Sequence, residues 1–217
     1  MSDFELCVIT ARSDRLQRGH LEVARAALEG GARLIQLRDK ALSSRALFEL
    51  AQEVRQLTRQ HRAQFIVNDR LDIALAVEAD GVHLGQDDLP IAAARRLLGP
   101  LAIIGASVRE RSQAEQAAAD GASYLGLGPI YASPSKSDAG PALGLAPIAD
   151  IQRNVGLPVL AIGGLTRDNV GEVIRAGASG AAVISAVSEA DSMVEATAAL
   201  LKAIRESRSR AASGVVS

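Results

Sequence analysis

Near its middle the sequence reads Ala119-Asp120-Gly121-Ala122-Ser123-Tyr124-Leu125-Gly126-Leu127-Gly128, an alanine-rich helical pattern that ends in glycine just before a short apolar run. The same junction recurs at Glu29-Gly30-Gly31-Ala32, at Ala79-Asp80-Gly81 and at Ala176-Gly177-Ala178. Glycine tolerates the left-handed conformation that closes a helix end. Each junction therefore predicts a helix that turns directly into a strand.

Eight short apolar or β-branched runs lie along the chain, and a helical pattern precedes each one after the first. The predicted strands are Leu6–Thr10, Leu34–Leu37, Gln64–Asn68, Gly81–Leu84, Ala102–Ser107, Tyr124–Gly128, Pro158–Ile162 and Gly180–Ser185. The clearest predicted helix is Ser44–His61. Eight such units favour a single-domain α/β fold, the (β/α)8 TIM barrel with parallel strands. An open doubly wound sheet is the alternative, although such sheets usually have fewer strands and leave edges exposed.

A chain of 217 residues with an apolar content of 48% suits one compact domain. We expect the catalytic barrel to span residues 1–206. After Ser207 the sequence becomes rich in Arg, Ser and Ala and loses its periodicity. Residues 207–217 are therefore predicted to form a flexible C-terminal tail.

Composition restricts the possible partners. The formal net charge of −1 lacks the basic surplus typical of nucleic-acid binding, so small molecules are the expected partners. No basic stretch precedes an apolar core at the N-terminus, and no apolar run approaches the roughly 20 residues of a membrane span. We predict a cytoplasmic protein with no membrane association, for which a homo-oligomer is compatible with the sequence. The single cysteine, Cys7, cannot form an internal disulfide and is predicted to pack within a strand.

Polar residues gather where the predicted strands end, which is where barrels build their active sites. Strand two runs into Gln36-Leu37-Arg38-Asp39-Lys40 and strand three into Asn68-Asp69-Arg70. Strand four runs into Gly85-Gln86-Asp87-Asp88, and strand five ends at Ser107.

The last three strands lead into segments suited to phosphate. Strand six enters the longest loop, Gly128–Asp138, which carries Ser133, Pro134, Ser135 and Lys136 and predicts a binding lid. Strand seven ends in Gly163-Gly164 and strand eight in Ile184-Ser185. Barrels most often bind phosphate after these two strands, through backbone N–H groups that glycine leaves accessible.

Each feature also has a purely structural explanation. Asp69 could cap the helix after strand three, and Gly163-Gly164 could form a tight turn with Thr166 or Asp168 capping the next helix. For His83, a structural hydrogen-bonded imidazole is favoured over an acid–base role. His83 is therefore left outside the predicted catalytic set.

The loop residues have similar alternatives. Arg38, Lys40 and Lys136 could be solvated surface cations, and the serines beside Pro134 could simply shape a turn. Convergence at one end of a barrel favours the functional explanation, because it brings cations, carboxylates, hydroxyls and glycine turns to one cavity. Two carboxylates from neighbouring strands suit Mg2+, and clustered cations suit a polyanionic substrate.

Seven motifs, in order, resemble the thiamine phosphate synthase family from Val8 to about Lys202. They are QLRDK at Gln36–Lys40, VNDR at Val67–Arg70, GVHLGQDD at Gly81–Asp88, GAS at Gly105–Ser107, GLGPIYASPSK at Gly126–Lys136, AIGGL at Ala161–Leu165 and VIS at Val183–Ser185. The resemblance implies coupling of 4-amino-2-methyl-5-hydroxymethylpyrimidine diphosphate to 4-methyl-5-hydroxyethylthiazole phosphate, which forms thiamine phosphate and pyrophosphate.

The resemblance also implies a role for individual residues. The pyrimidine diphosphate would be held by Gln36, Arg38, Lys40, Asn68, Ser107 and Lys136, among which Arg38, Lys40, Ser107 and Lys136 are the expected catalytic residues. The thiazole phosphate would be held by Ser133, Pro134, Ser135, Gly164, Ile184 and Ser185. Asp69 and Asp88 would ligate Mg2+, the expected cofactor.

Two other functions remain as alternatives. The related thiazole tautomerases share the barrel but lack the paired metal aspartates and carry a histidine where this chain has Pro129. A phosphate-metabolite sensor would keep the barrel and lack the chemistry. The presence of both Asp69 and Asp88 favours the synthase.

Overall fold

The computed structural model describes residues 4–13, 15–132 and 140–213, with side chains as far as residue 210. The strands are β1 (Leu6–Thr10), β2 (Leu34–Leu37), β3 (Gln64–Asn68), β4 (Gly81–Leu84), β5 (Ile103–Val108), β6 (Tyr124–Leu127), β7 (Val159–Ile162) and β8 (Gly180–Val183). The helices are α1 (His20–Glu29), α2 (Ser44–Gln60), α3 (Leu71–Ala76), α4 (Ile91–Leu98), α5 (Arg111–Ala119), α6 (Ala146–Val155), α7 (Val170–Arg175), α8 (Ser185–Ser188) and α9 (Met193–Ser213).

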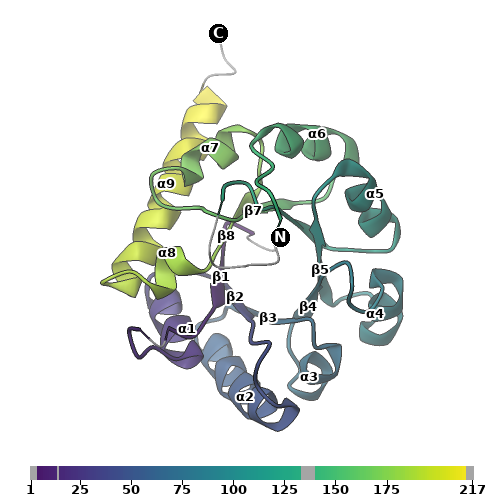
Figure 1. Ribbon diagram of the computed structural model, residues 1–217, viewed down its shortest axis with the longest axis vertical. Helices are drawn as coiled ribbons and strands as arrows, with labels where there is room; N and C mark the ends of the chain where they lie inside the picture. The colour runs from purple at the N-terminus through teal and green to yellow at the C-terminus, as the bar shows by residue number, and fades with distance from the viewer. Residues whose placement is uncertain (1–3, 14, 133–139, 214–217) are drawn as a thin grey trace.

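The strands form one closed parallel barrel in chain order. β8 closes it by pairing with β1, where Cys7 lies opposite Ala182. Figure 1 shows the strands as an inner ring and the helices as an outer ring. The predicted (β/α)8 barrel is confirmed, and closure excludes the open sheet because no strand is left with a free edge.

Most predicted element bounds agree with the structure, and the main difference lies at the end of the last strand. β8 stops at Val183, two residues before the predicted end, because Ser185 already begins the short helix α8. Helix α2 begins where expected, since the Ser43 hydroxyl accepts a hydrogen bond from the backbone N–H of Ala46 at 3.3 Å.

The glycine junctions are confirmed at three of the four places. Gly31, Gly121 and Gly177 all have φ between 92° and 107°. At the fourth junction the left-handed residue is Glu78, with φ of 52°. Gly81 is needed there for a different reason, because a Cβ atom at this position would lie 1.7 Å from the Ile103 carbonyl oxygen.

The core has two layers because side chains alternate between the two faces of each strand. One layer lies between the strands and the helices, and it includes Val8, Ile35 and Phe65. The other fills the barrel, where Cys7 and Tyr124 lie among apolar side chains. The predicted packed position of Cys7 is therefore confirmed.

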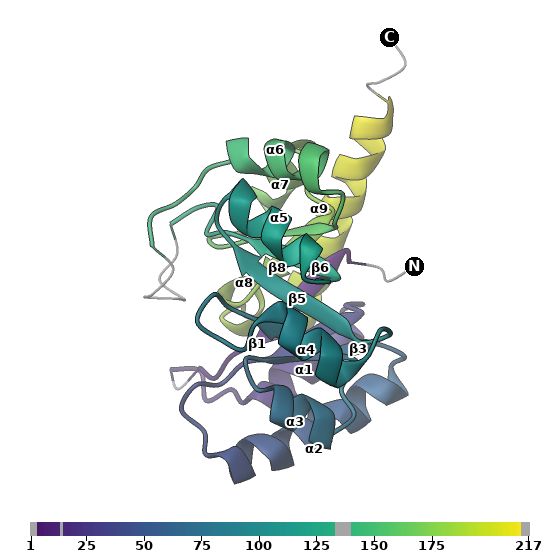
Figure 2. The same cartoon turned by 90° about the vertical axis from the view of Figure 1, so that its right-hand side faces the viewer.

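Helix α9 packs against α1 and α7, and Figures 1 and 2 both show it beside α7. The helix continues to Ser213, so the expectation that a tail begins at Ser207 does not hold. Ser207 is buried, and the Arg208 guanidinium bonds the Ser179 carbonyl oxygen and pairs with Glu5. Arg208 therefore binds neighbouring elements instead of belonging to a tail. Residues 214–217 lie outside the described part.

In the described part of the chain, no helix is both long enough and apolar enough to span a membrane.

Candidate active site

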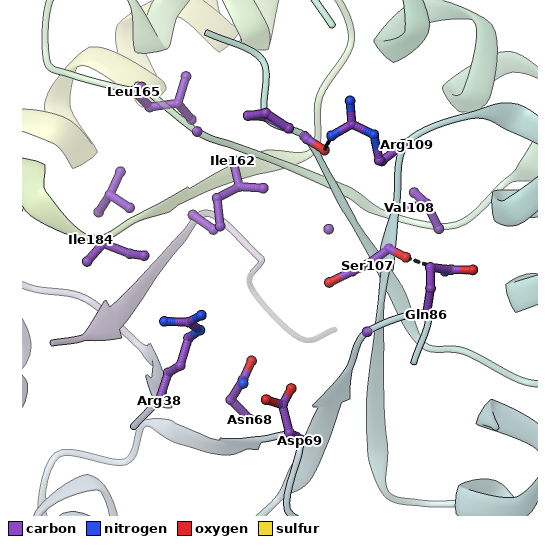
Figure 3. A pocket seen from close by; sticks show the side chains of 18 of the residues that line it. Arg38, Asn68, Asp69, Gln86, Ser107, Val108, Arg109, Ile162, Leu165 and Ile184 are labelled. Carbon is purple, nitrogen blue, oxygen red and sulfur yellow. Dashed lines mark hydrogen bonds between the residues drawn. The ribbon is translucent and has the colours of Figure 1, made fainter. Parts of the chain in front are cut away.

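A cavity of about 280 Å³ opens at the carboxyl ends of the strands. Its lining comprises Arg38, Lys40, Asn68, Asp69, Gly85, Gln86, Asp87, Asp88, Ser107, Val108, Arg109, Gly126, Gly128, Pro129, Ile162, Gly163, Gly164, Leu165, Ala182, Val183, Ile184 and Ser185. Figure 3 shows Arg38, Asn68 and Asp69 on one side, across the cavity from Ile162, Leu165 and Ile184. The predicted convergence of polar residues is thus present, with an apolar wall opposite the charged one.

The loop after β2 is held by hydrogen bonds on the side that faces away from the cavity. The Asp39 side chain is 9% exposed, and its Oδ1 accepts hydrogen bonds from the backbone N–H groups of Ala41 at 2.7 Å and Leu42 at 2.9 Å. Its Oδ2 lies 3.0 Å from His20 Nε2, and His20 Nδ1 lies 2.9 Å from the Thr10 hydroxyl. Asp39 therefore points away from the cavity and fixes the segment that carries its two cationic neighbours.

The His20 imidazole is neutral at neutral pH. Burial lowers the pKa of His20, against the raising effect of Asp39. The contact with Asp39 is therefore a hydrogen bond from a neutral ring, in which Nε2 donates and Nδ1 accepts from Thr10.

Asp69 occupies a tight turn at the end of β3. Its φ of 62° is left-handed, which is uncommon for a residue other than glycine, and its backbone N–H donates to the His83 carbonyl at 2.8 Å. The helix-cap explanation is wrong, because α3 begins at Leu71 without any side-chain cap. The turn instead places the carboxylate on the cavity.

Asp69 and Asp88 are hydrogen-bonded to each other across the ends of β3 and β4. Asp88 is held by the backbone N–H of Gly85, which donates to its Oδ2 at 2.6 Å. Burial and this acidic neighbour raise the pKa of Asp69 from 3.8 to about 6. The positive charges of Lys40 and Arg38 act in the opposite direction.

This pair of carboxylates fits a hard divalent cation. No cluster of three or more acidic, histidine or cysteine ligands occurs among the described residues. Mg2+ commonly takes one or two carboxylates and fills its other positions with water and substrate phosphate. Two carboxylates close enough to share a proton also repel each other when both are ionised, and a cation between them relieves that repulsion.

Ser107 and Asn68 line the middle of the cavity. Ser107 Oγ lies 2.9 Å from His83 Nε2, and the Ser107 carbonyl accepts a hydrogen bond from Gln86 Nε2 at 2.6 Å. His83 Nδ1 lies 2.9 Å from the Tyr124 hydroxyl. The structural interpretation of His83 is thus supported, although its ring touches a predicted catalytic residue.

Gln36 does not line the cavity. It is 3% exposed and lines a small internal void of about 20 Å³, which shares Ser107 and Gly126 with the lining of the cavity. Because side chains alternate along β2, the inward position that reaches the cavity is Arg38, two residues further on. The contact of Gln36 with the pyrimidine diphosphate stays a prediction from the sequence.

The turn after β7 is built from two left-handed glycines, Gly163 at φ 99° and Gly164 at φ 63°. A Cβ atom on Gly164 would lie 2.7 Å from the Ala132 carbonyl oxygen. Neither Thr166 nor Asp168 caps the next helix. Asn169 instead donates to the Gly164 carbonyl at 2.9 Å, which holds the turn against the cavity beside Ile184 and Ser185.

The predicted loop residues Ser133, Pro134, Ser135 and Lys136 lie outside the described residues. The described residues on both sides of this segment are hydrogen-bonded to neighbouring elements. The Ile130 N–H donates to the Ile162 carbonyl at 2.8 Å, and Arg109 Nη2 donates to the Pro141 carbonyl at 2.9 Å.

Sequence reasoning missed Arg109 and the apolar wall residue Leu165. Arg109 follows Ser107 by two positions, so strand alternation alone predicts that it faces the same way. The prediction ended strand five at Ser107, whereas β5 continues to Val108. Gln86 and Asp87 also line the cavity, and both lie in the polar run from which only Asp88 was selected.

Comparison with known proteins agrees with this geometry. The family model described as thiamine monophosphate synthase matches residues 6–187. A thiamine-phosphate synthase of Roseiflexus castenholzii is 51% identical over 193 residues, which are 89% of this chain and 85% of that protein. One from Moorella thermoacetica is 48% identical over 210 residues, covering 97% of this chain and 100% of that protein.

Among solved structures, the thiamine phosphate pyrophosphorylase from Pyrococcus furiosus superposes with a TM-score of 0.86 at 44% identity. The match covers 95% of this chain and 98% of that one. The resemblance that the motifs indicated is thereby confirmed. The chain belongs to the thiamine monophosphate synthase family, and its activity is that of a thiamine-phosphate synthase, a transferase that releases pyrophosphate.

Proposed function

We propose that the cavity holds two adjoining sites, a Mg2+-diphosphate site on β2 to β5 and a monophosphate site on β7 and β8. The observation that carries this proposal is the distribution of charge around the cavity. Cations and paired carboxylates line one side, and the glycine turn with Ser185 lines the other. Metal assistance is general in this family, and we assign Mg2+ to Asp69 and Asp88 because their oxygens suit that ion.

On the diphosphate side, Arg38 and Lys40 bind the phosphate oxygens of the pyrimidine substrate. Both come from the loop that Asp39 and His20 hold, so the backbone that carries them is fixed before the substrate arrives. Mg2+ bound by the two aspartates would add positive charge to the leaving diphosphate. Asn68 and Ser107 donate hydrogen bonds beside them.

On the monophosphate side, the backbone N–H groups of Gly164 and Ile184 and the hydroxyl of Ser185 bind the thiazole phosphate. The left-handed φ angles of Gly163 and Gly164 leave the backbone of this turn open to a ligand. Ser185 lies on the cavity at the start of α8, next to Ile184.

The chemistry requires positioning and charge neutralisation. The C–O bond between the pyrimidine methylene and the diphosphate breaks, and its electron pair leaves with the diphosphate oxygen. The electron-rich aminopyrimidine stabilises the resulting positive charge at the methylene. The thiazole nitrogen then forms the C–N bond with its own lone pair, so no general base is required. Arg38 and Lys40 stabilise the negative charge that develops on the leaving group.

The predicted contributions of Lys136 to the diphosphate and of Ser133, Pro134 and Ser135 to the thiazole phosphate stay predictions from the sequence.

Purified protein incubated with both substrates and Mg2+ tests the function directly. Release of pyrophosphate should require the thiazole phosphate as well as the pyrimidine diphosphate. Isomerisation of a thiazole without coupling would instead identify a tautomerase, and binding without turnover would identify a sensor.

The division into two sites is tested by the Michaelis constants of two variants. Arg38→Ala should raise KM for the pyrimidine diphosphate or lower kcat, and leave KM for the thiazole phosphate nearly unchanged. Ser185→Ala should raise KM for the thiazole phosphate alone. Equal effects of each variant on both substrates would contradict the division.

A further inference from the structure

The barrel interior contains a row of polar side chains that ends at the active-site cavity. His83 on β4 lies 2.9 Å from Ser107 Oγ through Nε2 and 2.9 Å from the Tyr124 hydroxyl through Nδ1. Tyr124 in turn is hydrogen-bonded to Gln36. His83 is 7% exposed, Tyr124 1% and Gln36 3%, so the row connects the cavity with the buried centre of the barrel.

The neighbouring strands leave room for this row. A Cβ atom at Gly105 on β5 would lie 2.3 Å from His83 Nδ1 and 2.4 Å from the Tyr124 hydroxyl oxygen. A Cβ atom at Gly126 on β6 would lie 2.9 Å from His83 Cε1. Any larger residue at either glycine would displace the imidazole, so the space for the ring is built into two strands.

The hydrogen-bonding capacity of these groups gives the row a direction. Burial raises the pKa of Tyr124 well above 10.0, so the phenol keeps its proton. A Gln36 amide that donates to the phenol oxygen leaves the phenol proton for His83 Nδ1, which lies 2.9 Å away. A neutral imidazole that accepts at Nδ1 donates at Nε2, and its acceptor there is Ser107 Oγ.

Ser107 Oγ consequently accepts from inside the barrel, and its own O–H is directed to a partner in the cavity. We propose that His83, held by Tyr124 and Gln36, is a positioning residue that makes the Ser107 hydroxyl a hydrogen-bond donor to the diphosphate leaving group. This inference rests on the proposed function, in which Ser107 faces the pyrimidine diphosphate.

A donor fixed in this way contributes more than a freely rotating hydroxyl, because it needs no reorganisation as charge develops on the leaving group. Tyr124 and His83 act only through Ser107. Their removal should therefore lower kcat while KM for the thiazole phosphate stays unchanged.

The decisive experiment is a double-mutant cycle between Tyr124→Phe and Ser107→Ala. Tyr124→Phe removes one hydroxyl and keeps the ring, whose centroid lies 5.0 Å from that of Phe4. We expect kcat to fall about ten-fold for Tyr124→Phe and about a hundred-fold for Ser107→Ala. The double variant should be no slower than Ser107→Ala alone, because the tyrosine has lost the group through which it acts.

A buried hydroxyl away from the active site supplies the control. The Thr197 hydroxyl donates to the Met193 carbonyl at 2.8 Å within α9. Thr197→Val should retain the parent kcat. Thermal unfolding of every variant separates loss of folded protein from loss of rate.

A pair of substitutions at His83 provides a second test if Tyr124→Phe does not fold. The amide nitrogen of glutamine can occupy the place of Nε2, whereas asparagine reaches only the place of Nδ1. His83→Gln should therefore retain more activity than His83→Asn.

The outcomes separate this inference from the function on which it rests. If Tyr124→Phe lowers kcat by the same factor in the Ser107→Ala background, the tyrosine acts independently of Ser107 and the inference is overturned, while the role of Ser107 stands. A parent-like kcat for Ser107→Ala would overturn both. Equal activities of the two His83 variants would also contradict the positioning role.

Discussion

Asp69 and Asp88 come from the ends of neighbouring strands, yet their carboxyl groups are hydrogen-bonded to each other. Burial and this contact raise the pKa of Asp69 to about 6. When both carboxyl groups are ionised they repel each other, which destabilises the protein without a ligand. A divalent cation bound between them would relieve that repulsion.

The affinity for Mg2+ should fall as the pH drops below about 6, because Asp69 must lose its proton to become a ligand. We expect about a ten-fold weakening per pH unit there and little change above about pH 7. Calorimetric titration with Mg2+ in the presence of pyrophosphate, repeated at several pH values, measures this affinity. Asp69→Asn should bind weakly at every pH, and an affinity of the parent protein that does not change with pH would contradict the assignment.

Asp69→Ala should lower turnover by about two orders of magnitude or more, as loss of one electrostatic contact with the developing charge typically does. Asp72→Ala is the matched control, since Asp72 follows the same strand but pairs with Arg70 at 2.6 Å and does not line the cavity. Steady-state pyrophosphate release compares the two. Near-parent rates in Asp69→Ala would remove this aspartate from the proposed site.

Lys136→Ala should cause a loss of similar size, about two orders of magnitude, if its ammonium stabilises the diphosphate. This prediction rests on the sequence, because Lys136 lies outside the described residues. Lys202 offers a comparison, since it is exposed on α9 and pairs with Glu206 at 3.9 Å. Lys202→Ala should keep the parent rate, and an equally active Lys136→Ala would show that the loop lysine is a surface residue.

Stability should decrease in mild acid because of His20. Burial holds the pKa of His20 below its ordinary value of 6.5, so the unfolded chain binds more protons than the folded one just below that pH. The contribution is present above pH 6.5 and is lost as the pH falls through the folded pKa. Urea unfolding at about pH 7.5 and about pH 5 measures the change.

In His20→Gln the part of this pH dependence that arises from the imidazole should vanish. His61→Gln, a substitution at the end of α2, should leave the dependence as it is. An unchanged dependence in His20→Gln would show that His20 is not its source.

The strand order and the identity of the site follow from local patterns. Short apolar runs after helices predicted the strands, and β1 to β4 have the predicted bounds. Arg38, Asp69 and Ser107 were expected on the cavity from their place at strand ends, and the structure puts all three there. Alternation is a property of a few consecutive residues, so the sequence is sufficient to predict which face and which end a side chain occupies.

The sequence by itself thus determined the barrel, its catalytic end and the polar residues gathered there. Only the tertiary structure decided which of them touch: the Asp69 pair with Asp88, the row from Gln36 to Ser107, and the depth that keeps Gln36 off the cavity. Contacts between strands depend on the stagger with which the barrel closes, and that stagger is set jointly by all eight strands. A pattern of a few consecutive residues therefore cannot predict this stagger.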